Sequence, residues 1–172
     1  FPTREPMLKE GKVDAITGFS FSSYLNLVRL GVPENDIKVL LMADYGLALY
    51  GNAIIVNTNF AKSNSSKVTG FLRAVANGWK DVIANPKKGA AMVAKRNPAA
   101  DVALEARRLK LSIDANVVTD YTKVNGMGNI DAARMAKAMK QLAQNYKFSN
   151  KPDMSKIFDA SYLPKDGSLK LK

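Results

Sequence analysis

The chain has 172 residues, of which 47% are hydrophobic and 24% charged, so it is long enough to form a domain with a real hydrophobic core. It contains no cysteine and no histidine, which excludes disulfides and thiol nucleophiles and removes the usual general base and the commonest metal ligands. The net charge of +11 is compatible with nucleic-acid binding, but the basic residues are spread along the polar sides of expected helices. We therefore expect a basic solvated surface and no nucleic-acid partner.

The first third of the chain has the pattern of alternating helices and strands. A short helix and a turn at Gly11 precede an expected strand at 13–18. Apolar residues at helical spacing then predict a helix over 20–30, with Ser20 as its N-cap and Gly31 as its end. Two further strands are expected at 37–42, "IKVLLM", and at 51–57, "GNAIIVN". This order is typical of an α/β layered fold.

The rest of the chain is expected to be helical. One continuous apolar stripe runs through "SSKVTGFLRAVANGWKDVIANP". Pro86 is placed to open the next helix, and Asp101, Asp114 and Asp131 are placed to cap the following ones. The expected helices cover residues 65–85, 86–97, 101–110, 114–123 and 131–146. The apolar residues of the last one are Ala132, Met135, Met139, Leu142 and Tyr146. Three strands cannot form a satisfactory two-faced sheet for so many helices, so we expect the missing strands to come from residues ahead of Phe1 or from another chain.

No catalytic motif is present. The sequence has no phosphate-binding loop, no complete dinucleotide-binding glycine motif and no serine-nucleophile elbow. The serines at 20, 22 and 23 have no histidine partner. We expect no enzymatic activity, no cofactor and no metal.

Two segments have the residues of a binding site. In "TGFSFSS", a strand ending at Gly18 is followed by serines at the start of a helix, which suits a ligand cleft or, equally, ordinary helix capping. In "ADYGLALYGN", tyrosines supply flat apolar faces with one hydroxyl each, and Gly46 and Gly51 permit the backbone conformations of a hinge. The alternative for this second segment is an aromatic turn at the edge of the core.

The order of these segments resembles a known family. "LKEGKVDAITGF", "LGVPENDIKVLLMADYGLALYGNAIIVN", "SSKVTGFLRAVANGWKDVIANPKKGAAMVAKRNP", "NGMGNID" and "YLP" resemble the periplasmic solute-binding components of ABC importers, in particular the NMT1/THI5-like family. That family includes binders of thiamin pyrimidine precursors, riboflavin, sulfonates and nitrate. "D-Y-G…Y-G" and "Y-L-P" look more like the pyrimidine-precursor branch.

The resemblance implies part of a two-lobed α/β fold of the type II periplasmic-binding-protein class. Residues 1–40 would end the second lobe, 41–51 would form the hinge crossover, and 52–172 would form the C-terminal, mostly helical portion of the first lobe, with the N-terminal half of the fold absent. Carried over by position, Gly18, Phe19 and Ser20 would face the cleft from one side. Asp44, Tyr45 and Tyr50 would lie near the hinge.

The function implied by the resemblance is non-catalytic capture of a small aromatic or planar nutrient for delivery to a membrane permease, in the periplasm or on an extracytoplasmic lipid anchor. Oxyanion binding in the same family and a basic helical interaction module remain alternatives. The fungal enzymes of the family depend on His and Cys, which this chain lacks. Because exposed sheet faces and edges promote association, we also expect the chain to self-associate or to be a remnant of a longer protein.

Overall fold

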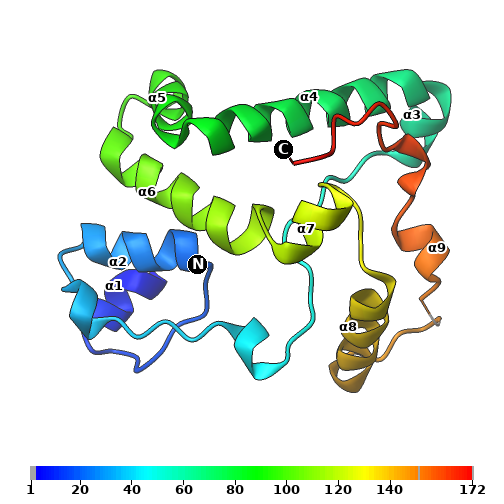
Figure 1. Cartoon of the computed structure of the whole chain (residues 1–172). Helices are drawn as coiled ribbons and strands as arrows, with labels where there is room; N and C mark the ends of the chain where they lie inside the picture. Colours follow the sequence, from blue (N-terminus) through cyan, green and yellow to red (C-terminus); the bar gives the residue numbers. More distant parts are fainter. Residues whose placement is uncertain (1–2, 151, 172) are drawn as a thin grey trace. The chain divides into compact units, whose positions relative to one another are not determined.

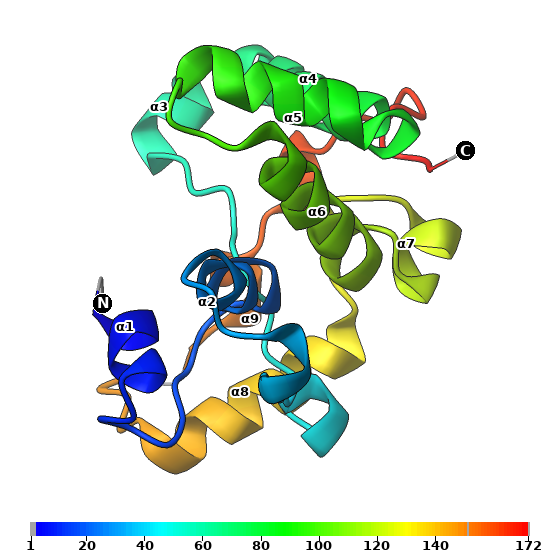
Figure 2. The same cartoon turned by 90° about the vertical axis from the view of Figure 1, so that its left-hand side faces the viewer.

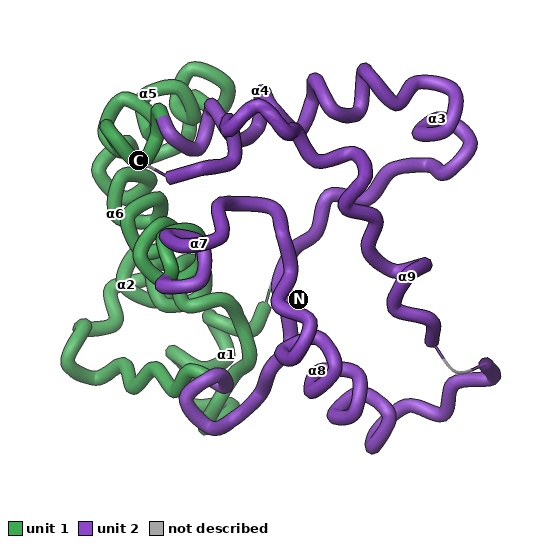
Figure 3. The backbone as a smooth tube through the Cα atoms, turned by 45° about the vertical axis from the view of Figure 1, so that its right-hand side comes forward, with its two compact units in different colours: residues 1–41, 81–119 green, residues 42–80, 120–172 purple. Residues whose placement is uncertain are grey.

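Helices and helical turns are the regular elements of the computed structural model, which describes residues 3–150 and 152–171 (Figure 1). The chain divides into two units, which are coloured separately in Figure 3. Unit 1 comprises Phe1–Leu41 and Asp81–Thr119, and unit 2 comprises Met42–Lys80 and Asp120–Lys172.

Unit 1 brings an N-terminal helical pair together with two longer helices from the middle of the chain. Its elements are α1 (Arg4–Lys9), a π-helical turn (Ser20–Tyr24), α2 (Leu25–Arg29), a 3-10 turn (Glu34–Asp36), α5 (Pro86–Arg96), α6 (Val102–Ser112) and a second π-helical turn (Ile113–Val117). α1 packs on α2, α5 packs on α6, and α6 also packs on the first π-helical turn (Figure 2). Leu25, Leu27 and Ile113 are buried in this unit.

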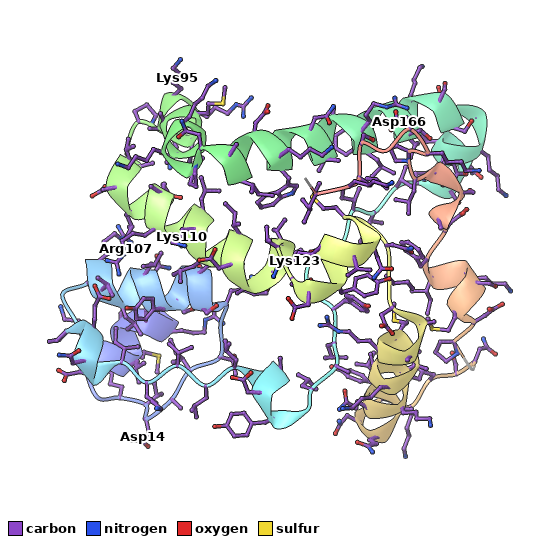
Figure 4. The ribbon with its side chains drawn as sticks, in the orientation of Figure 1. Asp14, Lys95, Arg107, Lys110, Lys123 and Asp166 are labelled. Atoms are coloured by element: carbon purple, nitrogen blue, oxygen red, sulfur yellow. The ribbon has the colours of Figure 1, made fainter. Side chains whose placement is uncertain are left out.

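Two adjacent arginines of α6 fasten the N-terminal part of unit 1. The guanidinium of Arg107 donates to both carboxylate oxygens of Glu34, at 3.0 and 2.9 Å (Figure 4). Arg108 donates to the carbonyl of Phe21 at 2.8 Å and pairs with Glu105 one turn earlier on the same helix. These bonds join segments that are more than seventy residues apart in the sequence.

Unit 2 combines the first part of α4 with short elements that precede it and with elements from the C-terminal third of the chain. Its elements are a 3-10 turn (Met42–Tyr45), α3 (Thr58–Ser63), α4 (Ser65–Ala84, which ends in unit 1), α7 (Asp120–Asn125), α8 (Ala132–Asn145), α9 (Met154–Ile157) and a 3-10 turn (Ala160–Tyr162). Small side chains make much of its core, because Ala61, Ala76 and Ala138 are the most buried apolar residues of this unit.

The C-terminal segment is held to α4. The hydroxyl of Thr69 donates to the carbonyl of Tyr162 at 2.9 Å, and Arg73 forms an ion pair with Asp166 (Figure 4). The hydrogen bond that Asp166 accepts from the Ser168 amide at 3.0 Å, together with the Arg73 guanidinium, holds the pKa of its carboxyl far below the ordinary range.

Most of the expected helices of the later chain are confirmed, with bounds close to the predicted ones. Pro86 opens α5, and the side chain of Asn85 accepts from the amide of Lys88 at 3.0 Å. The Asp101 carboxylate accepts from two amides of the first turn of α6, and Asp131 accepts from the amide of Arg134 at 2.8 Å to cap α8. Local sequence signals were sufficient here because a cap bonds only to residues two or three positions away.

Two local predictions are wrong. Asp114 does not begin a helix to 123, because α6 continues directly into the π-helical turn Ile113–Val117 and α7 begins only at Asp120. Ser20 makes no capping hydrogen bond, and the π-helical turn already begins at this residue. α3 was not predicted, although Asn57 caps it by accepting from the amides of Asn59 and Phe60.

The three predicted strands are also not found: among the described residues the structure contains no β-strand. The segments 13–18 and 51–57 have no regular structure, and 37–42 has none until Met42 enters the following 3-10 turn. The apolar, β-branched pattern favours a strand, but a strand forms only when a second strand accepts and donates its backbone hydrogen bonds. The observed part of the fold is therefore helix-rich, without the strands of the α/β class.

Candidate ligand-binding site

The segment Gly46–Tyr50, in which 47–50 have no regular structure, lies along α8 in unit 2 and is bonded to side chains of that helix. Gln141 accepts from the amide of Ala48 at 2.8 Å and donates to the carbonyl of Gly46 at 2.9 Å. Arg134 donates to the carbonyls of Ala48 and Leu49 at 3.0 and 2.9 Å. Gly46 has a φ of +89°, and the preceding 3-10 turn ends at the residue before it.

Tyr50 is held from two directions. The Arg134 guanidinium lies over its ring, 4.3 Å from the ring centroid. Its hydroxyl oxygen accepts from the backbone amide of Asp131 at 2.8 Å. Among the described residues, the Tyr50 hydroxyl has no acceptor for its own proton, so this proton is available to a ligand.

An apolar groove of about 450 Å³ lies beside Tyr50. One wall is the apolar face of α8, another is formed by Leu49 and Tyr50, and the third comes from the chain around α9. Its lining residues are Leu49, Tyr50, Met135, Ala138, Met139, Leu142, Phe148, Pro152 and Ile157. This volume is within the range of small-molecule sites, which are mostly apolar and carry a few polar groups that orient the ligand.

The chemistry of the groove suits a small planar ring. Tyr50 and Phe148 offer aromatic surfaces. Met135 and Met139 offer polarisable sulfur, which packs favourably against ring edges and adapts to irregular shapes. The lining residues carry no formal charge, so the Tyr50 hydroxyl is the polar side-chain group that can orient a ligand.

The environment of Tyr121 includes Tyr50 and Asp131 and affects its pKa. The pKa of Tyr121 is raised above its ordinary value of 10.0, first by burial and then by the nearby Tyr50 and Asp131. Tyr121 therefore keeps its proton throughout the physiological range and adds no negative charge near Tyr50.

The other residues proposed from the family resemblance occupy two places. Asp44 and Tyr45 lie in the 3-10 turn ahead of Gly46; they are exposed, Tyr45 by 75%, and do not line the groove. Gly18, Phe19 and Ser20 belong to unit 1, where the Phe19 ring stacks on Phe21 with 5.1 Å between centroids. The six residues thus fall in different units, and only Tyr50 lies in the groove.

Sequence reasoning missed the residues that hold the segment, although it found the face that lines the groove. Met135, Met139 and Leu142 were expected on one apolar stripe of the last helix, and all three line the groove. Arg134 and Gln141 are seven positions apart, about two helical turns, and therefore lie on the same side of α8. This spacing was the available signal, but the partner segment lies more than eighty residues away.

A second, more polar cavity of about 500 Å³ lies at the start of α4. Its lining consists of hydroxyl-bearing side chains and one arginine: Ser65, Ser66, Thr69, Arg73, Ser161 and Tyr162. Arg73 is already paired with Asp166, and Thr69 with the Tyr162 carbonyl. An anion in this cavity would compete with those contacts for the arginine.

Within the described ranges, no group of three or more acidic, His or Cys side chains is arranged to hold a metal ion. No helix in the described part of the chain is both long enough and apolar enough to cross a membrane.

A family model described as NMT1/THI5 like matches residues 3–89, just over half of the chain. The chain therefore belongs to the NMT1/THI5-like family, as its sequence motifs predicted. No curated protein and no solved structure matches the chain. Members of this family are generally binding proteins rather than enzymes and are typically extracytoplasmic, so membership indicates a solute-binding role in transport.

Proposed function

We propose that this chain is part of the solute-binding component of an ABC importer and that its groove beside Tyr50 receives a small aromatic or planar nutrient resembling a thiamin pyrimidine precursor. The observation that carries the proposal is the uncharged groove of about 450 Å³ that Tyr50 and two methionines line on α8. The protein releases the nutrient to a membrane permease from the periplasm or from an extracytoplasmic lipid anchor. It performs no chemistry on the ligand and needs neither cofactor nor metal.

The proposal includes the two-lobed α/β architecture of periplasmic binding proteins, with residues 1–40, 41–51 and 52–172 as the end of one lobe, the hinge and part of the other lobe. The exposed apolar segments support it, because Leu40 is 62% exposed and Ile55 is 91% exposed. Such side chains are normally covered once a strand is part of a sheet. Gly18, Phe19 and Ser20 would then reach the ligand from the opposite lobe, and Asp44 and Tyr45 from the hinge.

Isothermal calorimetry with four ligands tests the assignment. The chain is titrated with 4-amino-5-hydroxymethyl-2-methylpyrimidine, riboflavin, taurine and nitrate. We expect the pyrimidine or riboflavin to bind with a Kd below about 100 μM, equivalent to about −5.5 kcal/mol. Absence of binding by all four would overturn the assignment.

Two variants test whether the ligand binds in the groove. Tyr50→Ala removes an aromatic wall and the orienting hydroxyl, so it should weaken binding at least about tenfold, or 1.4 kcal/mol. Phe60→Ala removes an aromatic side chain that is 48% exposed on α3 and outside the groove, so it should leave the affinity unchanged. If the two variants changed the affinity equally, Tyr50 would not be part of the ligand site.

Oxyanion binding is the second candidate, and the polar cavity at the start of α4 favours it. Arg73 and the hydroxyls of Ser65, Ser66 and Thr69 have the donor chemistry that nitrate or a sulfonate requires. Binding of nitrate or taurine that Arg73→Ala abolishes and Tyr50→Ala leaves intact would select this candidate over the first.

A basic interaction module is the candidate from a different class, and the net charge of +11 is its only support. Phosphate binding by many cations weakens steeply between about 50 and 200 mM salt. A DNA or RNA duplex that shows no binding even at the lower salt concentration would eliminate this candidate.

A further inference from the structure

The clamped segment depends on two side chains that do not themselves line the groove. Arg134 and Gln141 contribute four hydrogen bonds to the backbone of Gly46, Ala48 and Leu49. Neither side chain contacts the cavity, whose α8 wall consists of Met135, Ala138, Met139 and Leu142.

The backbone of Ala48 shows why these bonds matter. Ala48 is 8% exposed, its amide donates to Gln141 and its carbonyl accepts from Arg134. A buried backbone group that loses its partner is costly, and a segment without a neighbouring strand has no alternative partner. Loss of either side chain would therefore release the segment from α8.

The same contacts fix the groove wall. Leu49 and Tyr50 directly follow the clamped Ala48, and both line the groove. Arg134 also lies over the ring of Tyr50, while Asp131 at the start of α8 binds its hydroxyl. Ring orientation and segment position are thus set together by one helix.

We propose that Arg134 and Gln141 are positioning residues for the ligand groove: they hold Gly46–Tyr50 on α8 so that Leu49 and the Tyr50 ring form a fixed wall. The role as a ligand-site determinant rests on the function proposed above, but the clamp itself can be measured without a ligand. The proposed role also requires arginine rather than lysine at position 134. A planar guanidinium can bond two carbonyls and stack on a ring at once, which an ammonium group cannot do.

The experiment compares the full wild-type chain with Gln141→Leu, Arg134→Ala, Arg134→Lys and the matched control Lys140→Ala, which is exposed on the same helix. Hydrogen exchange at the Ala48 amide reports the Gln141 bond. The carbon-13 ring resonance of Tyr50, assigned by its loss in Tyr50→Phe, reports the ring position. Calorimetry with 4-amino-5-hydroxymethyl-2-methylpyrimidine reports affinity, and circular dichroism confirms that each variant is folded.

We expect Gln141→Leu to accelerate Ala48 exchange about tenfold, as for the loss of one hydrogen bond. Arg134→Ala should move the Tyr50 resonance, and Arg134→Lys should restore it only in part. Gln141→Leu and Arg134→Ala should each weaken pyrimidine binding about tenfold, while Lys140→Ala changes none of the readouts. A purely structural role would lower the unfolding temperature without this pattern.

Three kinds of failure are distinguishable. An unchanged Tyr50 resonance and unchanged Ala48 exchange in the folded variants overturn the clamp, whatever the affinity. Changed resonance and exchange with unchanged pyrimidine affinity overturn the positioning role. If the wild-type chain binds none of the four ligands, the proposed function fails, and the positioning role fails with it even if the clamp itself is observed.

Discussion

Glu34 is the residue on which three parts of unit 1 converge. Its carboxylate accepts from the Tyr24 hydroxyl of the first π-helical turn and from Arg107 of α6. The hydrogen bond from Tyr24 and then that from Arg107 lower the pKa of Glu34 below its ordinary value of 4.5. The charged form of Glu34 is therefore favoured by folding.

This lowered pKa predicts an acid-sensitive contribution to stability. Because the folded pKa of Glu34 lies below 4.5, its contribution is complete above about pH 4.5 and is lost as the pH falls through the folded pKa. Glu34→Gln should lower the urea midpoint at pH 7 and flatten the decrease of that midpoint as the pH falls below about 4.5.

The control for this prediction is Asp14→Asn, at an exposed position in the loop after α1 (Figure 4). This variant should keep the wild-type pH dependence. A Glu34→Gln variant with the same acid sensitivity as the wild-type chain would show that the three-residue contact contributes nothing.

Gly18 is required by close approach rather than by its φ angle. A Cβ at this position would lie 2.0 Å from the Oγ of Ser23 and 2.8 Å from its Cβ, and Ser23 is buried. Gly18→Ala should therefore lower the free energy of unfolding by about 1–3 kcal/mol, as measured by urea unfolding.

The matched control is Gly70→Ala on α4, where a Cβ meets no atom within 4 Å. It should instead raise the free energy of unfolding by up to about 1 kcal/mol, because alanine is the better helix former. If both substitutions stabilise the protein, then the segment before the π-helical turn is not packed on Ser23.

At the scale of elements, α8 shows what the sequence can and cannot predict. Its length, its cap at Asp131 and its apolar stripe follow from patterns within about four residues, and all were anticipated. The contacts of Gln141 with Gly46 and Ala48 span more than ninety residues and were not. The strands were predicted wrongly for the same reason, because strand pairing also depends on residues far apart in the sequence.

The cap of α8 gives an element-scale prediction. Asp131→Ala removes the carboxylate that accepts from the Arg134 amide at 2.8 Å, which should destabilise the protein by about 1 kcal/mol in thermal unfolding. Asp131→Asn retains a capping oxygen and should remain close to the wild-type stability. Both variants keep the backbone amide that binds Tyr50, so a selective loss in the alanine variant measures the cap itself.

At the scale of the whole molecule, much apolar surface is uncovered. Leu25 is the only large side chain with essentially no exposure among the described residues, whereas large apolar side chains are exposed throughout 39–42 and 54–56. Within the described chain, the backbone of 52–56 has no hydrogen-bond partner. An exposed apolar segment with free backbone groups is a template for pairing with another chain.

We therefore expect the chain to self-associate through the segment 52–56, in which Ile55 is the most exposed apolar residue, at 91%. Light scattering at increasing protein concentration should show a rising mean mass for the wild-type chain. Ile55→Lys places a charge in the exposed segment 52–56, so it should reduce this rise in mean mass without loss of the helical circular dichroism signal. A wild-type chain that remains a monomer at all concentrations would refute the expectation.

The claim that the groove on α8 binds the ligand has one most direct test. The chain has seven methionines, of which only Met135 and Met139 line the groove. Methyl carbon-13 spectra recorded during titration with 4-amino-5-hydroxymethyl-2-methylpyrimidine therefore locate the bound ring. We expect saturable shifts of the Met135 and Met139 methyl resonances while those of Met7 and Met92 stay unchanged. Saturable binding that leaves Met135 and Met139 unshifted would show that the ligand binds elsewhere.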